Sequence, residues 1–392
     1  SLRTLQDMEP NVRPHKPGPA SQTPDTAGAD ARRAVLVLGM HRAGTSALAR
    51  VLSLRGASLP AHVMPPNPGN PAGYWEPERI VALNDAMLDY FGVQWDDPFA
   101  AAQLPAAADF PARFRAEAAS ILAGEFDGAD LFVLKDPRCT LLFGFWQSAL
   151  AAAGATVAPV VIMRRFAEVA DSLVRRDGTS VAGAALLYVA YGLEAARVAA
   201  DGATVVSYDQ LLGDWRATTD RIAAAQGFAW PVSGARMGNA VEAYLRRPAA
   251  PAARATQLPA ALQRWTDAVW AWFDAAAQGQ PQPLDALDAV RDELQAAAAI
   301  YAPLLADRAK RAQELGAQLE ETKQQLAKAS QLLDESQATL ARTAGERDDL
   351  MAQRDTALQG QQEAQAQAVA LVAERDAAIA EHHKALALFE AV

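Results

Sequence analysis

The sequence has a single cysteine, Cys139, among its 392 residues. One cysteine excludes a disulfide within the chain and any metal site built from several cysteines. The five histidines are scattered along the chain and form no metal-binding motif. We therefore expect no metal cofactor and a reducing, cytoplasmic setting.

Long apolar runs and an excess of basic residues are also missing. Apolar runs such as 159–163 are far too short to cross a bilayer, and we find no signal peptide. The formal net charge is −10, which gives no compositional support for nucleic-acid binding. We expect no nucleic-acid partner and no transmembrane segment, and any anionic ligand must be attracted by local arginines.

The stretch 34–46, AVLVLGMHRAGTS, organises the rest of the chain. Its apolar part, 35–38, predicts a strand buried on both faces of a parallel sheet. Gly39 and Gly44 permit a tight turn that leads into a helix. Backbone N–H groups of residues 42–46 would then converge on an anion at the start of that helix.

The same stretch departs from the P-loop pattern at one position. Gly39 and Gly44 have the P-loop spacing and Ser46 follows, but Thr45 occupies the place of the lysine. Nucleoside triphosphatases use that lysine on the β- and γ-phosphates. A ligand with a single 5′ anionic group, such as a nucleotide phosphosulfate, could instead be held by Arg42, Thr45, Ser46 and the backbone.

Three further apolar runs predict strands, at 131–134, 157–163 and 205–208. Helical patterns separate them, so we predict βαβ units and an α/β fold: a P-loop-like three-layer αβα sandwich around a mainly parallel sheet. The helices expected in the first half of the chain cover 45–56, 77–91, 111–126 and 141–153. A proline- and glycine-rich loop, 57–76, interrupts the pattern, and long loops of this kind are often functional.

Composition divides the chain into four predicted segments. These are a disordered N-terminal arm (1–32), an α/β domain (33–250), a helical extension packed on it (251–302) and a long helical or coiled-coil segment (303–392). In the last segment leucines recur every seven residues, at 319, 326, 333 and 340, with weak companion positions. We predict a coiled coil over 304–345 that makes the chain a homo-oligomer, and weakens or shifts phase beyond Arg347; the alternative is a single solvated helix.

Four segments of this sequence resemble the bacterial carbohydrate-type sulfotransferases of the P-loop-like sulfotransferase superfamily. They are Gly39 to Ser46, the Gly-Tyr-Trp-Glu segment 73–76, the Leu-Lys-Asp-Pro-Arg segment 134–138, and Arg164 to Ser172. The resemblance covers about residues 34–250. It implies the donor 3′-phosphoadenosine 5′-phosphosulfate (PAPS) and transfer of its sulfuryl group to a hydroxyl acceptor, typically on a glycan.

The resemblance also implies which residues bind the donor. By this resemblance the first loop binds the 5′-phosphosulfate through Arg42, Ala43, Gly44, Thr45 and Ser46. Arg164 and Ser172 bind the 3′-phosphate, with Arg165 as a substitute for Arg164. The family usually has proline where this chain has Phe166, which puts the local turn in doubt. Arg246 matches loosely a late basic segment that closes over the same phosphate.

Sulfuryl transfer also needs cations around the reacting oxygens and a base for the acceptor proton. Lys135 suits the first role because it follows a buried strand, where ligands of parallel sheets bind. Glu76 is the first candidate for the base, and His41 and Asp136 are the alternatives. Glu76 could instead be a helix-start carboxylate. Arg138 could contact a substrate or anchor its turn by pairing with Asp136.

Two other functions remain open from the sequence. A P-loop nucleotide kinase is disfavoured by Thr45 at the lysine position. A non-catalytic scaffold, which binds nucleotide through the α/β domain and assembles through the coil, is disfavoured by the complete set of site residues, Glu76, Lys135, Arg164 and Ser172.

Overall fold

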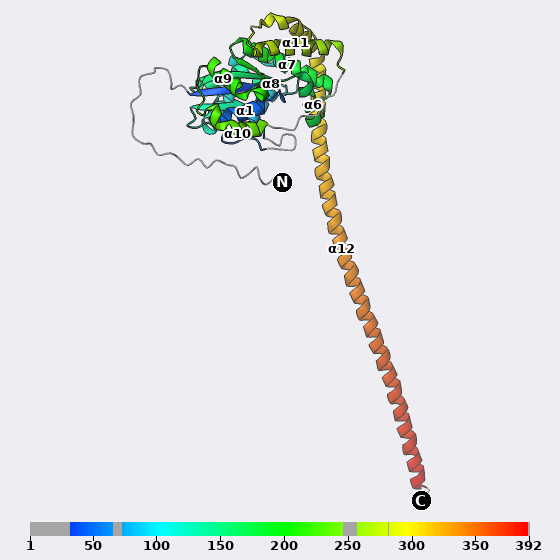
Figure 1. Cartoon of the computed structure of the whole chain (residues 1–392). Coiled ribbons are helices and arrows are strands. Elements are labelled where there is room, and N and C mark those ends of the chain that lie inside the picture. Colours follow the sequence, from blue (N-terminus) through cyan, green and yellow to red (C-terminus); the bar gives the residue numbers. More distant parts are fainter. Residues whose placement is uncertain (1–31, 66–72, 246–256, 281, 391–392) are drawn as a thin grey trace, which may run out of the picture. The chain divides into compact units, whose positions relative to one another are not determined.

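The structure is a computed structural model that describes residues 32–65, 73–245, 257–280 and 282–390 (Figure 1). The chain divides into two compact units, Ser1–Ala306 and Asp307–Val392. The predicted N-terminal arm, apart from Arg32, lies outside the described residues, as does Arg246.

Four parallel strands form one sheet in the order β2-β1-β3-β4. The strands are β1 (Arg33–Leu38), β2 (Leu131–Lys135), β3 (Thr156–Met163) and β4 (Thr204–Ser207). The chain passes from β1 to its neighbour on one side and then returns to its neighbour on the other. The topological switch point therefore lies beside β1, where parallel sheets open a ligand crevice at their carboxyl ends.

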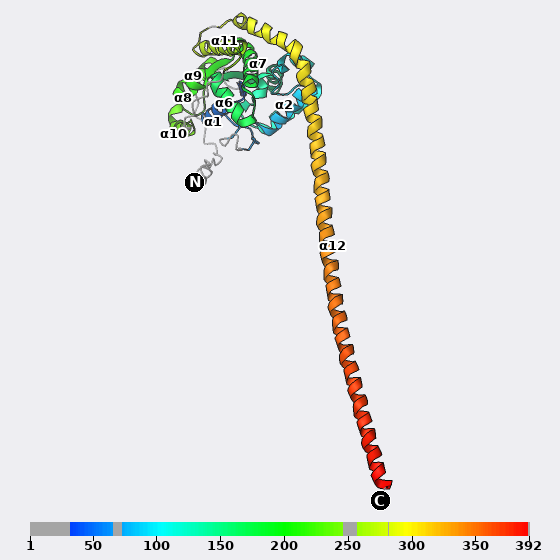
Figure 2. The same cartoon turned by 90° about the vertical axis from the view of Figure 1, so that its right-hand side faces the viewer.

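Helices cover both faces of the sheet, because the side chains of β1 alternate between two hydrophobic clusters. Leu36 and Leu38 belong to one cluster, and Val35 and Val37 to the other. The first face is covered mainly by α2 (Glu78–Tyr90), α4 (Ala112–Glu125), α5 (Phe143–Ala152), α7 (Val181–Ala200) and α11 (Ala260–Ala277). The second is covered by α1 (Thr45–Leu54), α8 (Tyr208–Gly213), α9 (Trp215–Ala225) and α10 (Gly234–Leu245) (Figures 1 and 2). The predicted αβα sandwich is confirmed.

The sequence also placed most of these elements within two or three residues of their ends. The predicted helix at 77–91 is α2, and one apolar face of it is buried: Ile80, Leu83, Met87 and Leu88 are each at most 1% exposed. The remaining short elements are α3 (Ala100–Gln103), α6 (Phe166–Asp177) and the 3₁₀ turns η2 (Ala107–Asp109), η3 (Pro137–Thr140) and η4 (Leu284–Leu287).

Helix α7 is the one helix in the described residues that is long and apolar enough to cross a membrane. Its apolar composition has an explanation in the fold. In its apolar stretch 67% is buried inside the domain, and α7 packs against α6, α11 and β3. Figure 2 shows α7 and α11 side by side. The apolar stretch of α7 is longer than the apolar runs noted in the sequence analysis. Glycines and alanines separate its larger apolar side chains, so the stretch is less conspicuous in the sequence.

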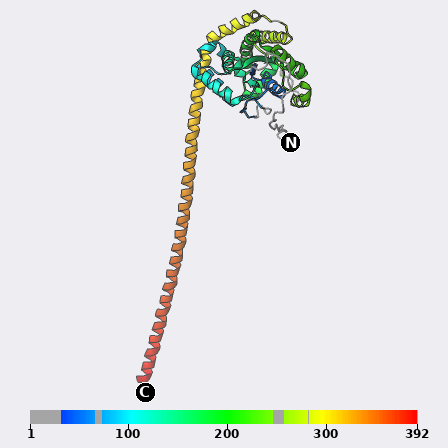
Figure 3. The ribbon, with the colours of Figure 1, turned by 90° about the vertical axis from the view of Figure 1, so that its left-hand side faces the viewer.

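Helix α12 (Asp288–Glu390) begins in the first unit and forms all of the described second unit. Val290 and Leu294 are buried against the core of the first unit. From Asp307 to Leu386 every side chain is exposed, and Figure 3 shows this part, orange to red, as one continuous helix. The long C-terminal helix predicted within 303–392 is therefore confirmed as far as Glu390, and its self-association stays a prediction.

Candidate active site

The loop between β1 and α1 requires glycine at two positions. Gly39 has φ of +138°, and a Cβ there would lie 2.4 Å from the carbonyl oxygen of Ile162. Gly44 has φ of +106°, and a Cβ there would lie 2.5 Å from the ring of Tyr208. Between them Arg42 has a left-handed φ of 69°, which is uncommon for a residue with a side chain. The loop is thus pressed against the ends of two other strands.

Helix α1 starts directly from this loop. Its N-cap is Gly44, which provides no side-chain cap. The N–H groups of a first helical turn have no partner within the helix, and the helix dipole makes that end positive. Thr45, Ser46 and Ala47 therefore present their N–H groups to the space in front of the loop. This geometry suits an anion, as the sequence predicted.

A cavity of about 70 Å³ opens in front of this loop. It is lined by His41, Arg42, Gly44, Thr45, Ser46, Ala47, Tyr74, Glu76, Lys135, Pro137, Arg164, Arg176 and Tyr208. The segments that follow all four strands contribute to it. Four cationic side chains and only one carboxylate line the cavity, so a chain with net charge −10 has a locally positive site.

Lys135 is the last residue of β2 and lies at the centre of these contacts. Its side chain is 2% exposed, and its Nζ donates to Ser46 Oγ at 3.0 Å, to the Tyr74 carbonyl at 3.1 Å, and to Glu76 Oε1. A buried ammonium needs such partners. The lysine therefore ties the phosphate-type loop to the 73–76 segment.

Glu76 is the partner of Lys135 rather than a free helix-start carboxylate. It is 5% exposed and lines the cavity just before α2. Burial raises the pKa of the Glu76 carboxyl above its ordinary value, and the adjacent Lys135 limits that rise. A carboxyl with a raised pKa beside a cation is a suitable proton acceptor.

Asp136 and Arg138 have a structural role in this arrangement. Asp136 is fully buried, does not line the cavity, and accepts from the backbone N–H of Arg138 at 3.1 Å and from Asn84 Nδ2 at 2.7 Å. Arg138 pairs with Asp136 at 3.0 Å and with Asp85 at 2.6 Å. Of the two roles expected for Arg138, the contacts show the anchoring one. Asp136 caps η3 and fixes the turn that follows Lys135.

His41 lies inside the loop between aromatic rings. Its ring centroid is 4.3 Å from that of Trp95 and 6.0 Å from that of Tyr191. Nε2 is buried and has no hydrogen-bond partner among the described residues. Burial lowers the pKa of His41 well below its ordinary value, and the charges of Arg138 and Arg176 lower it further. The imidazole is therefore neutral at neutral pH, with one buried nitrogen that lacks a partner in the described protein.

The lowered pKa of His41 predicts an acid-side loss of stability. Below about pH 6.5 the unfolded chain protonates this histidine while the folded chain does not, so the free energy of unfolding falls as the pH falls. Urea unfolding of wild type and His41→Asn between about pH 5 and about pH 7 should show a shallower pH slope for the variant, by up to about 1.4 kcal/mol per pH unit. Equal slopes would contradict a buried neutral His41.

Of the two residues predicted to bind the 3′-phosphate, Arg164 lines the cavity and Ser172 does not. Arg164 lines the cavity at the end of β3, pairs with Glu168, and lies over the Tyr208 ring at 4.5 Å. Ser172 is 6% exposed on α6 and accepts from Arg42 Nε at 2.7 Å. It therefore supports the loop arginine. Arg165, the substitute, pairs with Asp209 at 3.4 Å and does not line the cavity.

Sequence reasoning missed two lining residues, Arg176 and Tyr208. Arg176 lies one helical turn after Ser172 on α6, so the i, i+4 spacing could have indicated that both face the loop. It lies over the Trp95 ring at 5.7 Å and pairs with Asp177. Tyr208 follows β4, and its strand-end position was the available signal. Its ring packs against Gly44.

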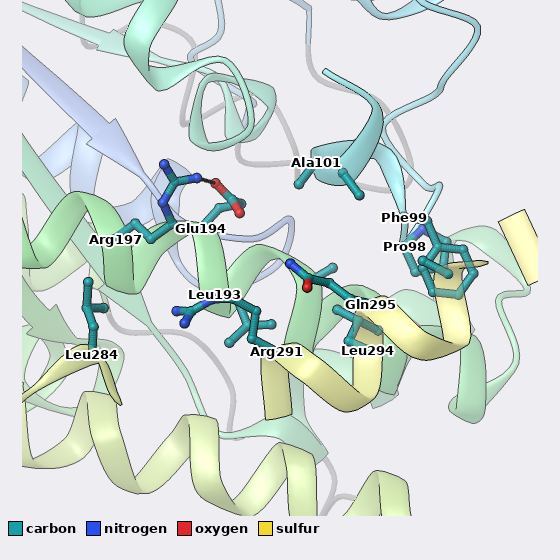
Figure 4. Close-up of a pocket in the computed structure, with 13 residues that line it drawn as sticks. Pro98, Phe99, Ala101, Leu193, Glu194, Arg197, Leu284, Arg291, Leu294 and Gln295 are labelled. Atoms are coloured by element: carbon teal, nitrogen blue, oxygen red, sulfur yellow. Dashed lines mark hydrogen bonds and ion pairs between the residues drawn. The ribbon is translucent and has the colours of Figure 1, made fainter. Parts of the chain in front are cut away.

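A second cavity, of about 450 Å³, lies between α7, the start of α12 and the segment around Phe99 (Figure 4). It shares no lining residue with the first cavity. Figure 4 shows Glu194 paired with Arg197, and the two atoms lie 3.0 Å apart. Burial raises the pKa of Glu194, and Arg197 opposes the rise. Although it is larger, no strand end lines this cavity, so the first cavity is the candidate active site.

The fold and the site together define a P-loop-like α/β protein with a cationic anion cradle. Within the described ranges no group of three or more histidine, cysteine, aspartate or glutamate side chains could hold a metal ion. No family model matches the chain, and no curated protein matches it. The chain is similar to a solved structure, the sulfotransferase domain from the Synechococcus PCC 7002 olefin synthase, with 18% identity and a TM-score of 0.33 over 67% of this chain and 100% of that chain. Likeness at this level does not establish a shared function.

Proposed function

We propose that this protein is a sulfotransferase that moves the sulfuryl group of PAPS to a hydroxyl, on a glycan or a glycan-bearing acceptor. The observation that supports the proposal most is the group of four cations, Arg42, Lys135, Arg164 and Arg176, around the start of α1. Such a group suits a ligand with two anionic ends. The nature of the acceptor rests only on the resemblance noted from the sequence.

The donor would enter with its phosphosulfate in the cavity. Pockets that enclose a drug-sized ligand measure roughly 300–1,000 Å³, so a cavity of about 70 Å³ accommodates the anionic end and leaves the nucleoside outside. The N–H groups of Thr45 and Ser46, with Arg42, would hold the 5′ end. Arg164, at the next strand end, would face the 3′-phosphate, and its pairing with Glu168 would have to open.

The proposed reaction is an in-line displacement at sulfur. The acceptor oxygen forms a bond to sulfur while the bond from sulfur to the 5′-phosphate oxygen breaks, and the electron pair leaves with adenosine 3′,5′-bisphosphate. Glu76 takes the hydroxyl proton. Lys135 stabilises the charge that develops on the bridging oxygen, and the neutral His41, which also lines the cavity, is the alternative base.

The proposal also includes assembly and location. Self-association through α12 would make the enzyme a homo-oligomer, and the reducing cytoplasm stays its predicted location.

A nucleotide kinase is the second candidate function, because the loop has P-loop spacing. It is disfavoured because Thr45 replaces the lysine that such kinases place on the β- and γ-phosphates.

Calorimetric titration with adenosine 3′,5′-bisphosphate tests the donor site directly. We expect micromolar binding, about −8 kcal/mol, that Arg164→Ala weakens strongly because the 3′-phosphate loses its cation. Arg175→Ala is a matched control, since Arg175 lies on α6 but is half exposed and pairs with Asp171 outside the cavity.

Titration with ATP and magnesium completes the experiment. Tighter binding of ATP than of the bisphosphate would favour the kinase. Binding of neither nucleotide would favour the scaffold. Equal bisphosphate binding by wild type and Arg164→Ala would leave the site in place but would refute the assignment of Arg164.

A further inference from the structure

The exposed part of α12 has a heptad pattern that changes partway along the helix. In one frame, labelled a to g, position d holds Leu319, Leu326, Leu333 and Leu340. In the same frame, position a holds Met351, Leu358, Val372, Ile379 and Leu386, interrupted once by Gln365. Each of the nine apolar side chains in these two sets is at least 45% exposed in the single chain. The aliphatic stripe therefore moves from d to a near residue 344 without a break in the frame.

The positions opposite the stripe are polar in each half. Position a is Lys323, Ser330 and Gln337 in the first half. Position d is Arg347, Arg354, Arg375 and His382 in the second half. Neither half therefore has two apolar positions per heptad, which is why the first half alone shows weak companion positions. A partner must supply the missing apolar position.

We propose that α12 pairs with α12 of a second copy of this chain in an antiparallel coiled coil. Antiparallel helices bring an a position of one chain opposite a d position of the other. Three of the four leucines of the first half then meet aliphatic residues of the second half, and Leu340 lies opposite Gln365. The pairs are Leu319 with Leu386, Leu326 with Ile379, and Leu333 with Val372, each formed twice by symmetry. The paired stretch, 319–386, is about 100 Å long at 1.5 Å per residue.

Charge disfavours the parallel arrangement. Parallel helices bring d opposite d, so Arg347, Arg354 and Arg375 would each face the same arginine of the other copy inside the seam, where like charges repel each other. In the antiparallel register Arg347 lies opposite Leu358, Arg354 opposite Met351, and Arg375 opposite Ser330. No core layer then contains two like charges.

The flanking positions agree with this orientation. Position g carries no charged residue; it holds threonine, serine or alanine at 322, 329, 336, 343, 357, 364, 378 and 385, and leucine at 350 and 371. A parallel pair would lack the interhelical salt bridges that g usually provides. An antiparallel pair places g beside g, where small side chains let the helices approach closely. Asp348 and Asp355 face each other at the centre, and Arg347 and Arg354 neutralise them at 2.5 Å.

A shift by one heptad is the nearest competing register. It would pair Leu319 with Ile379 and Leu326 with Val372, but it would place Lys323 opposite Arg375. The proposed register places Lys323 opposite His382 instead and so contains no layer of lysine against arginine. The register that pairs Leu326 with Ile379 is therefore preferred over this shift.

Disulfide trapping in the full-length chain tests orientation and register together. The native Cys139 is buried, and burial raises its thiol pKa well above the ordinary value, so it leaves a low background. Leu326→Cys and Ile379→Cys are purified separately and oxidised alone or as a mixture. We expect a covalent dimer, at twice the chain mass, only in the mixture. Sedimentation equilibrium of the unmodified chain should give the same dimer.

Each other result would overturn the proposal. A covalent dimer from Leu326→Cys alone would show parallel helices. More efficient trapping of Leu319→Cys with Ile379→Cys would show the shifted register. A monomer in sedimentation, with no trapping in any mixture, would show a solvated single helix. Because these substitutions lie on an exposed helix outside the α/β unit, they leave bisphosphate binding unchanged, and that binding serves as the folding control.

Discussion

Lys135→Met should lower the rate of sulfuryl transfer by at least about 100-fold, the usual effect of removing one preorganised charge donor from a transition state. Methionine retains the length of the buried stem but removes the ammonium that contacts Ser46, Tyr74 and Glu76. The rate is measured with radiolabelled donor and a panel of hydroxyl acceptors, under saturating donor. The same variant should lose about 3 kcal/mol of stability or more, since Glu76 is left buried without its cation.

A second variant separates the two effects. Lys135→Met combined with Glu76→Gln removes both charges, so much of the lost stability should return while transfer stays abolished. Urea unfolding measures the first quantity, and bisphosphate titration shows that the donor site persists. Normal transfer by Lys135→Met, with donor still bound, would show that Lys135 is not the transition-state cation. No recovery of stability in the double variant would show that the ion pair is not what the single variant breaks.

The sheet and its strand ends were predictable because local sequence determines them. Short apolar runs such as 35–38 and 157–163 fit only buried parallel strands, and the glycine spacing after the first run determines the turn. Parallel strands then bring their carboxyl ends to one edge, so Lys135 and Arg164 had to lie near the loop. These inferences do not depend on which helix packs against which face of the sheet.

The partners of the site residues were not predictable in the same way. Lys135 could pair with its neighbour Asp136 or with a distant carboxylate, and only the path of the 57–76 loop brings Glu76 to it. Ser172 meets Arg42 and not Arg164, because the turn of α6 sets which face looks toward the loop. Arg176 was missed for the same reason. Tertiary packing, rather than spacing, decides such contacts.

The change of the aliphatic residues from position d to position a along α12 shows a different limit of prediction from sequence. The seven-residue leucine spacing over 319–340 was visible at once, and beyond it Arg347 and Arg354 fell on the leucine register and suggested that the coil weakens or shifts phase. Following the frame through α12, which is helical to Glu390, shows that the aliphatic residues continue at the other core position. A pattern judged on one chain therefore underestimates a seam that, in the proposed antiparallel pair, two chains would complete.

Gly39→Ala should destabilise the fold by about 2 to 4 kcal/mol and abolish bisphosphate binding. The added Cβ would lie 2.4 Å from the backbone oxygen of Ile162, and only a movement of β1 or β3 can relieve that clash. A left-handed φ adds about 1 kcal/mol for any residue with a Cβ. Displacing the loop also disturbs the hydrogen bond of 2.9 Å from the Gly39 N–H to Thr140 Oγ1. Urea unfolding and calorimetric titration measure the two effects.

Gly154→Ala is a control that measures the cost of a positive φ without the cost of a steric clash. Gly154 has φ of +76°, and a Cβ there meets nothing within 4 Å. It lies in the turn between α5 and β3, outside the residues that line the cavity. Its replacement should therefore cost only about 1 kcal/mol and leave bisphosphate binding unchanged. If Gly39→Ala is no more destabilising than Gly154→Ala and still binds the bisphosphate, the close approach of the loop to β3 is not what positions the anion site.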